Sequence, residues 1–395
     1  WKAVGDIAGY STTKVDADKL DATSFVGVDN LLADKGGRID ATYQPNTARL
    51  TAYEPGDILL GNIRPYLKKV WMAENNGGCS GDVLAIRILA DCKKIISPEY
   101  LYYALSSDSF FSYSMQHAKG AKMPRGSKDA ILNYQIPIPC PSAPGKSLAI
   151  QSEIVRILDK FTALTAELTA ELTMRKKQYN YYRDKLLSFE ECEVEWKTLD
   201  EVASFRRGSF PQPYGNSEWY NGEGCMPFVQ VADVADFGFR LHRSTKQQIS
   251  KLAQSKSVFV EAGTVIVSLQ GTIGRVALTQ YDCYVDRTLA IFTKYKAAVN
   301  KKYFAHQLKA KFDLEKEFAR GSTLKTITKE EFSKFQIPIP PLEVQNRIVA
   351  LLDKFDRLTH SIEEGLPREL ELRQKQYEYY RELLFSFPKL EAASN

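Results

Sequence analysis

The residues best suited to chemistry in this chain are basic and polar side chains near the ends of predicted strands. Arg and Gln can hydrogen-bond base edges bidentately, whereas Lys mainly neutralises phosphate. Each side chain alone would more often be a solvated surface charge, but their clustering predicts contact with DNA. The candidates are Asn62, Arg64, Lys68, Lys69, Lys119, Lys122, Arg125 and Lys128 in the first half, and Arg206, Arg207, Arg240, His242, Arg243, Gln270, Thr272, Arg275, Arg320, Thr323 and Lys325 in the second.

Sequence motifs of catalysis are incomplete or missing. Pro144-Gly145-Lys146-Ser147 resembles the end of a phosphate-binding loop, but the required glycine is replaced by Cys140, so a plain turn is predicted. Glu195-Trp196-Lys197 matches the tail of a nuclease E-x-K motif without its Pro-Asp, and is interpreted as a chance match in a linker. No G-x-S-x-G, G-x-G-x-x-G or methyltransferase aromatic tetrad occurs. We therefore predict no catalytic, metal or cofactor site.

Composition narrows the class of protein. At 395 residues, two to three domains are expected. A hydrophobic share of 44% and a net charge of +5 suit a globular protein and permit a polyanionic partner. No apolar run approaches the ~18 residues of a membrane helix. The six cysteines form no C-x-x-C pair and the four histidines show no metal-ligand spacing, which favours reduced thiols in a cytoplasmic protein. Because the chain starts at Trp1 without a leader, we expect a trimmed rather than an exported protein.

One sequence unit occurs twice, starting at Trp1 and again at Trp196, so its period is 195 residues. A period this long indicates a duplicated domain with its helix rather than a solenoid. The ends of the two copies match well and the middles only weakly, which predicts a shared framework carrying two different binding surfaces. The matching segments are 135–139 and 336–340 (Gln-Ile-Pro-Ile-Pro), 151–154 and 345–348, 158–161 and 352–355 (Leu-Asp-Lys-Phe), and 178–183 and 376–381 (Gln-Tyr-x-Tyr-Tyr-Arg).

Each copy ends in a predicted long amphipathic helix. From 149 to 189 there is no Pro or Gly, and apolar residues recur at spacings of three and four. About 40 residues at 1.5 Å each give a rod of roughly 60 Å. Its apolar stripe needs a partner, which the stripe beginning at Ile348 supplies. An antiparallel pair would relate the halves by an approximate two-fold axis. Gly365-Leu366-Pro367 should kink or break the second rod.

The fold class predicted is α+β: two mixed α/β globules joined by two long antiparallel coiled-coil helices, with a pseudo-two-fold internal repeat. Short strands are expected at 57–60, 83–86, 265–267 and 276–278, and helices at 98–105 and 302–312. The predicted domains are 1–146 and 196–341 for the globules, 147–195 for the central helix with an acidic linker, and 342–395 for the distal helix and tail.

This organisation resembles the specificity subunit of a type I restriction–modification system. The most specific marker is the tandem Leu-Thr-Ala-Glu at 164–171, which with the segment 149–161 is similar to the IC branch of that family. The resemblance implies that each globule is a target-recognition domain for one half of a bipartite site on double-stranded DNA. It implies that the helices set the spacing and dock two methyltransferase subunits, which bring two motor-nuclease subunits. It further implies that S-adenosylmethionine, ATP and Mg²⁺ belong to those partners, so this chain would hold no cofactor.

Two other functions are compatible with parts of the pattern. A stand-alone methyltransferase or nuclease would need motifs that are missing, and binding of S-adenosylmethionine would reveal it. A structural coiled-coil protein with protein-binding globules would not need basic residues at matched strand ends, and a gel shift with random DNA would separate it from a DNA-binding subunit.

Overall fold

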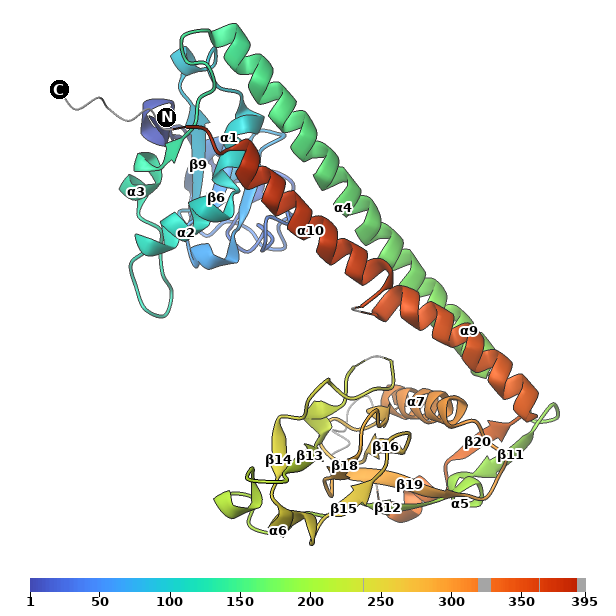
Figure 1. The fold of residues 1–395 in the computed structure, drawn as a ribbon. Coiled ribbons are helices and arrows are strands. Elements are labelled where there is room, and N and C mark those ends of the chain that lie inside the picture. Colours follow the sequence, from blue (N-terminus) through green and yellow to red (C-terminus); the bar gives the residue numbers. More distant parts are fainter. Residues whose placement is uncertain (237, 319–327, 362, 389–395) are drawn as a thin grey trace. The chain divides into compact units, whose positions relative to one another are not determined.

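The computed structural model describes residues 1–236, 238–318, 328–361 and 363–388 (Figure 1). The chain divides into two compact units, Trp1–Ala166 with Leu372–Asn395, and Glu167–Glu371. The division falls inside α4 (Pro144–Leu187) and inside α10 (Gly365–Leu384). Each unit therefore contains one globule together with segments of long helix from both sequence repeats.

The globule of the first unit is built on two four-stranded sheets. In the first sheet all neighbours are antiparallel, and in the second β4 runs parallel to β8. A two-stranded ribbon joins the start of the chain to the end of the globule. The strand orders are β2 (Ala8–Tyr10), β9 (Val83–Ile88), β6 (Ile58–Gly61), β7 (Val70–Met72); β3 (Lys14–Asp16), β5 (Arg49–Tyr53), β8 (Gly77–Cys79), β4 (Phe25–Val26); and β1 (Lys2–Ala3) with β10 (Gln135–Ile136).

The globule of the second unit repeats this plan with one change. Its first sheet has the same order, and in its second sheet β13-β18-β15 corresponds to β4-β8-β5. The fourth strand, however, is added beside β13, whereas β3 lies beside β5. The orders are β12 (Ala203–Arg207), β19 (Leu289–Tyr295), β16 (Val265–Ser268), β17 (Val276–Leu278); β14 (Gln247–Ile249), β13 (Met226–Val229), β18 (Cys283–Val285), β15 (Val258–Val260); and β11 (Glu195–Thr198) with β20 (Gln336–Ile339).

Three layers result in each globule, because strand side chains alternate between the two faces of a sheet. In β6, Ile58 and Leu60 join the core against the helices, whereas Leu59 faces the second sheet. In β16, Val265 and Val267 face the helices and Ile266 faces the second sheet. The remaining helices are α1 (Pro98–Leu105), α2 (Asp108–Gln116), α3 (Lys128–Asn133), α5 (Leu199–Val202), α6 (Lys251–Gln254), α7 (Lys301–Phe318), α8 (Lys329–Ser333) and α9 (Leu342–His360).

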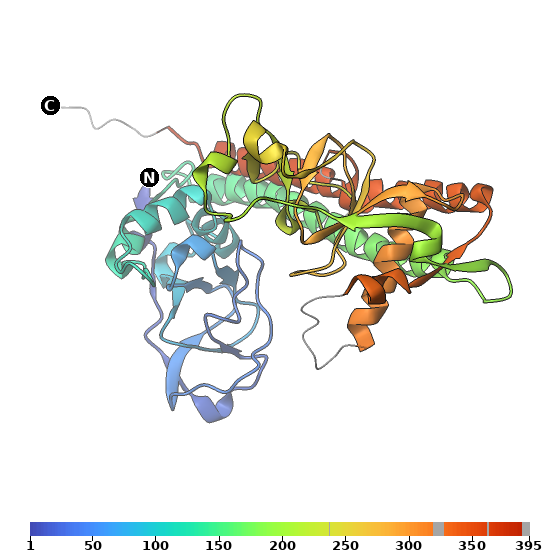
Figure 2. The ribbon, with the colours of Figure 1, turned by 90° about the horizontal axis from the view of Figure 1, so that it is seen from below.

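Long helices pack in pairs within each unit. In the first unit Phe161 of α4 stacks on Tyr380 of α10, with ring centroids 5.6 Å apart. In the second unit Tyr182 of α4 stacks on Phe355 of α9 at 5.8 Å. The paired segments run antiparallel, as can be followed in Figures 1 and 2. In the first unit α4 supplies the phenylalanine of the stacked pair, and in the second unit α4 supplies the tyrosine. The same two repeat positions therefore meet in both units, as expected for an internal repeat.

Repeated side chains fasten the long helices to the globules. Gln151 is fully buried, where its amide nitrogen donates to the carbonyl of Ile95 at 2.7 Å and its oxygen accepts from the Ser97 amide at 3.0 Å. Gln345 is equally buried and bonds Pro340 and Asn300 at 2.7 and 2.8 Å.

The repeated Gln-Ile-Pro-Ile-Pro segment is held in the same way in both units. The hydroxyl of Tyr100 donates to the Pro137 carbonyl at 3.0 Å, and that of Tyr303 donates to the Pro338 carbonyl at 3.1 Å. The internal repeat is therefore a repeat of buried hydrogen bonds as well as of sequence, and the predicted fold class is confirmed.

Several local predictions are confirmed and others need correction. Helix 98–105 and the break near Gly365 are found, since α9 ends at His360 and α10 begins at Gly365. Residues 144–147, predicted as a plain turn, form the first turn of α4, because proline is well accommodated at the first helical position. Glu195-Trp196-Lys197 is not in a linker: it lies in β11, paired with β20. The four domain boundaries remain predictions.

None of the helices in the described part of the chain combines the length and the apolar character needed to cross a membrane.

Burial of one histidine makes folding of the second unit pH-dependent. His306 lies in α7, 4% exposed and edge-on to Phe239 with ring centroids 4.5 Å apart. Burial disfavours its charged form and lowers its pKa to about 3. Because the unfolded chain binds this proton near pH 6.5, the stability is complete above that pH and is lost as the pH falls toward 3.

We predict that acidification from pH 7 to pH 5 costs roughly 2 kcal/mol of unfolding free energy through His306. In His306→Gln this part of the pH dependence should disappear, whereas His242→Gln, at an exposed position, should retain it. Urea unfolding at several pH values measures the difference. Parallel curves for the parent and His306→Gln would show that His306 does not carry the effect.

Candidate DNA-binding surfaces

In the first globule, two loops that carry predicted DNA-binding residues lie together. Residues 62–69 connect β6 to β7, and residues 117–126 follow α2. The amide of Arg64 donates to the Pro124 carbonyl at 2.7 Å, and the amide of Gly126 donates to the Asn62 carbonyl at 3.0 Å. Ile63 and Arg125 form an isolated antiparallel bridge. Sequence reasoning placed both groups near strand ends, which is right for residues 62–69 and wrong for residues 117–126, because these connect α2 to α3. The backbone hydrogen bonds join the two groups into one surface.

The side chains of this surface fall into two groups. Arg64, Lys119 and Lys122 are exposed, and within the described residues their side chains have no hydrogen-bonding or ion-pair partner. Arg64 has a left-handed backbone with φ of 52° and precedes the short helical turn Pro65–Leu67. These cations are available to a ligand in the structure as it stands.

The other members contact the protein itself. Lys68 binds Asp108 at 2.8 Å, Lys69 donates to the Val28 carbonyl at 2.7 Å, and Arg125 pairs with Asp82. Asn62 is only 7% exposed, and its side-chain oxygen has no partner among the described residues. Lys128 lies 5.8 Å from the centre of the Tyr10 ring. These residues shape the loops, and their DNA contacts remain predictions.

In the second globule, the loop between β16 and β17 occupies the same topological position as residues 62–69. It carries Gln270, Thr272 and Arg275. Arg275 is held by Asp236 at 2.6 Å and donates to the Val234 carbonyl at 3.0 Å. In the strand register Ala290 of β19 pairs with Arg207 on one side and with Val267 on the other. Arg206 and Arg207, the last residues of β12, therefore lie at the same end of the sheet as this loop.

Arg240 and Arg243 lie elsewhere in the second unit, at the end of α9. Arg240 donates to the His360 carbonyl at 3.4 Å, and Arg243 pairs with Glu363. His242 is exposed between them. Arg320, Thr323 and Lys325 lie outside the described residues. Among the residues that are described, no group of three or more His, Cys, Asp or Glu side chains could hold a metal ion.

Sequence reasoning missed the acidic partners. Asp82, Asp108 and Asp236 each contact a predicted DNA-binding cation but are distant from it in sequence. It also missed Arg287, whose guanidinium lies 5.4 Å from the centre of the Tyr214 ring. No local spacing signals such contacts, because chain topology creates them.

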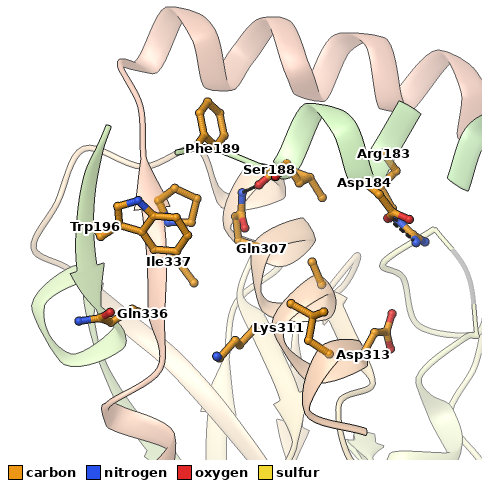
Figure 3. Close-up of a pocket in the computed structure, with 14 residues that line it drawn as sticks. Arg183, Asp184, Ser188, Phe189, Trp196, Gln307, Lys311, Asp313, Gln336 and Ile337 are labelled. Atoms are coloured by element: carbon orange, nitrogen blue, oxygen red, sulfur yellow. Dashed lines mark hydrogen bonds and ion pairs between the residues drawn. The ribbon is translucent and has the colours of Figure 1, made fainter. Parts of the chain in front are cut away.

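A cavity of 540 Å³ in the second unit is lined by repeated framework residues (Figure 3). Trp196 and Ile337 come from β11 and β20, Gln307 from α7, and Arg183 and Asp184 from α4. The Gln307 amide bonds the Leu187 carbonyl at 3.1 Å. The corresponding residues of the first unit line a 420 Å³ cavity, which includes Trp1, Ala104, Ile136, Pro137 and Glu382.

The repeat also leaves matching aromatic side chains exposed. In the repeated Gln-Tyr-x-Tyr-Tyr-Arg segment, Tyr181 is 62% exposed and its counterpart Tyr379 is 65% exposed. The first tyrosine of each segment, Tyr179 or Tyr377, instead packs inward. Both units therefore expose an equivalent tyrosine on the repeated framework.

Comparisons with known proteins agree with this architecture. Residues 56–174 and 192–372 match the family model described as type I restriction modification DNA specificity domain. The chain is 48% identical over 277 residues to the specificity subunit of the Escherichia coli type I restriction enzyme EcoR124I/EcoR124II, covering 67% of each chain. It is 34% identical to a putative type I specificity subunit of Haemophilus influenzae, covering 75% of this chain and 74% of that protein.

Solved structures share the fold. A structure described under complex assembly and conformational transition of the type I R-M system has a TM-score of 0.63 at 22% identity, covering 98% of this chain and 97% of that one. The HsdS subunit from Thermoanaerobacter tengcongensis gives 0.51 at 21% identity, covering 98% and 95%.

The family model spans most of the chain, and a relative of nearly half-identical sequence covers two thirds of it. The chain therefore belongs to the type I restriction–modification DNA specificity family. It is the DNA-recognition subunit of such a system and not a catalytic one.

Proposed function

We propose that each globule reads one half of a bipartite DNA site, and that the repeated framework docks two methyltransferase subunits. The observation that carries this proposal is a single framework present twice, with different side chains on the loops at equivalent strand ends. Two different loops suit two different half-sites, whereas similar framework surfaces suit two copies of one partner. Selection of bound DNA by the assembled complex, followed by sequencing, tests the proposal as a whole.

The partners complete the enzyme in this proposal. Two motor-nuclease subunits join through the methyltransferases, which use S-adenosylmethionine, while the motor uses ATP and Mg²⁺. This chain contributes base reading and spacing and binds none of these cofactors. A complex that acts on cellular DNA works in the cytoplasm.

The loop arginines should act on separate half-sites. Arg64→Ala should weaken binding to one half-site and Arg275→Ala to the other, each by about 1–3 kcal/mol if the arginine is bidentate to guanine. Competition binding with half-site variants measures the effect. If both substitutions relax the same half-site, the two-reader proposal is wrong, and equal weakening of all sequences would make that arginine a phosphate contact.

The exposed framework tyrosines should dock partners independently. Tyr181→Ala and Tyr379→Ala should each reduce the bound methyltransferase subunits from two to one, because each removes a large apolar contact from one of two equivalent surfaces. Native mass spectrometry counts the subunits. Tyr43→Ala is the matched control, since Tyr43 is 46% exposed but lies in a globule. Full occupancy in both framework variants would remove these tyrosines from the interface.

The tandem Leu-Thr-Ala-Glu at 164–171 should set the spacing between half-sites. One further unit lengthens α4 by about 6 Å and rotates the following residues by only ~40°, so the leucine stripe continues. The complex should select the same half-sites with a longer spacer: since one base pair spans ~3.4 Å, a rod longer by ~6 Å has room for the one added base pair that the family resemblance suggests. A one-residue insertion, which rotates the helix by ~100°, is the control expected to disrupt binding. An unchanged spacer length would show that the repeat does not set the distance between the half-sites.

A further inference from the structure

Asp108 is the centre of a charge network in the first unit. It lies in the first turn of α2, where an acidic side chain is favoured by the helix dipole. Its Oδ1 accepts from Lys35 Nζ at 2.9 Å and from Lys68 Nζ at 2.8 Å. Its Oδ2 lies 3.4 Å from Nη2 of Arg381, which comes from α10. One carboxylate therefore joins three segments that are far apart in the sequence.

Arg381 is the buried member of this network. The side chain is fully buried, and its Nη1 donates to the Ser106 carbonyl at 3.3 Å. Its Nε and Nη2 make no hydrogen bond within the described residues. Asp108 and, at 4.0 Å, Glu382 are the carboxylates near it. Because a buried charge is costly unless it is paired, Asp108 must stay ionised to hold Arg381 in place.

The protonation state of Asp108 agrees with this role. Partial burial alone would raise its pKa, but the hydrogen bonds from Lys68 and Lys35 and the charge of Arg381 lower the pKa to about 2. The carboxylate is thus ionised at neutral pH.

The network also fixes the backbone of the candidate DNA-binding loop. Lys35 and Lys68 both have left-handed backbones, with φ of 62° and 50°, which cost free energy unless neighbouring contacts hold them. The amide of Lys35 donates to the Lys68 carbonyl at 2.9 Å, and the amide of Asp34 donates to that of Leu67 at 2.9 Å. Lys68 ends the short helical turn that begins after the exposed Arg64.

This arrangement is not found among the described residues of the second unit. Asp108 stands eight residues after Tyr100, and the residue eight after the equivalent Tyr303 is Lys311. Arg183, the counterpart of Arg381, pairs with Asp184 at 2.7 Å. The Asp108 network is therefore not part of the repeated framework and belongs to the first reader alone.

We propose that Lys68, Asp108 and Arg381 are positioning residues for DNA specificity: they tie the loop that carries Arg64 to the spacer helix α10, and Lys68 acts through Asp108 rather than on phosphate. This inference rests on the proposed reading of one half-site by the first globule. It assigns to Lys68 a role different from the DNA contact predicted from its position near a strand end.

Salt dependence separates the two roles. Loss of a lysine that contacts phosphate weakens binding to all sequences alike, and it reduces the magnitude of the slope of log K against log salt by ~0.9. A positioning lysine leaves that slope unchanged and lowers discrimination at one half-site. In the complex with methyltransferase subunits, Lys68→Met should reduce discrimination at the first half-site by roughly five- to tenfold, within the range of couplings in one charge network. The second half-site should be unaffected.

Further variants complete the test. Lys122→Met is the matched control, an exposed lysine of the same surface expected to lower the salt slope. Asp108→Asn should reduce discrimination at the same half-site at least as strongly as Lys68→Met, because it also takes the nearer carboxylate charge away from Arg381, and adding Lys68→Met to it should have no further effect if they act as a unit. If Asp108→Asn fails to fold, Arg381→Lys takes its place, because it keeps the charge but loses the reach of the guanidinium.

The outcomes are distinct. The proposal is overturned if Lys68→Met lowers the salt slope, weakens all sequences equally or changes nothing. Failure of the underlying function looks different, because Arg64→Ala would then also leave half-site discrimination unchanged. The positioning role is supported if Lys68→Met loses discrimination at the first half-site while its salt slope stays unchanged, and if Arg64→Ala also lowers discrimination at that half-site.

Discussion

The structure depends on one constraint: each globule is fixed to a long helix by an amide side chain with no access to water. Gln151 and Gln345 are fully buried, and each bonds backbone groups at the start of the globule's own helical region. A buried amide left without partners would cost roughly 1–3 kcal/mol, so the geometry around it is tightly specified. Register and orientation of helix against globule are thereby set in both units, independently of the loops that differ.

This constraint explains where the two halves are free to diverge. The first sheet, the two-stranded ribbon and the paired helix segments all contribute to the buried framework, and they keep the same order in both units. The second sheet touches the helices less directly, and there the edge strand has moved from one side to the other. The loops after β6 and β16 stand at the outer end of the shared sheet. Exposed side chains such as Arg64 can change there without disturbing the hydrogen bonds of Gln151 and Gln345.

The framework could be predicted from the sequence because it depends on local patterns, such as the spacing of apolar residues, and because these patterns occur in both copies of the repeat. The long helix followed from the spacing of its apolar residues, and the break near Gly365 followed from Pro367, which cannot donate to a preceding turn. The weakly matching middles of the two copies also contain equivalent strands: Phe25-Val26 forms β4, and the similar Phe228-Val229 lies in β13. Residues 144–147 form a helical turn rather than a plain turn because proline suits the first position of a helix. Residues 195–197 form a strand because they pair with β20, more than 130 residues away, which no local pattern signals.

The candidate surfaces could be predicted only in part, because charge pairing is a property of topology. Arg64 and Lys68 stand four residues apart and both are basic, yet Arg64 is exposed and has no side-chain partner among the described residues, whereas Lys68 binds a carboxylate. Arg275 likewise reaches Asp236 on another loop. Such pairs lower the net positive potential of each surface, which weakens indiscriminate attraction to phosphate. The chain's modest charge of +5 is consistent with selectivity that depends on a few oriented side chains rather than on bulk attraction.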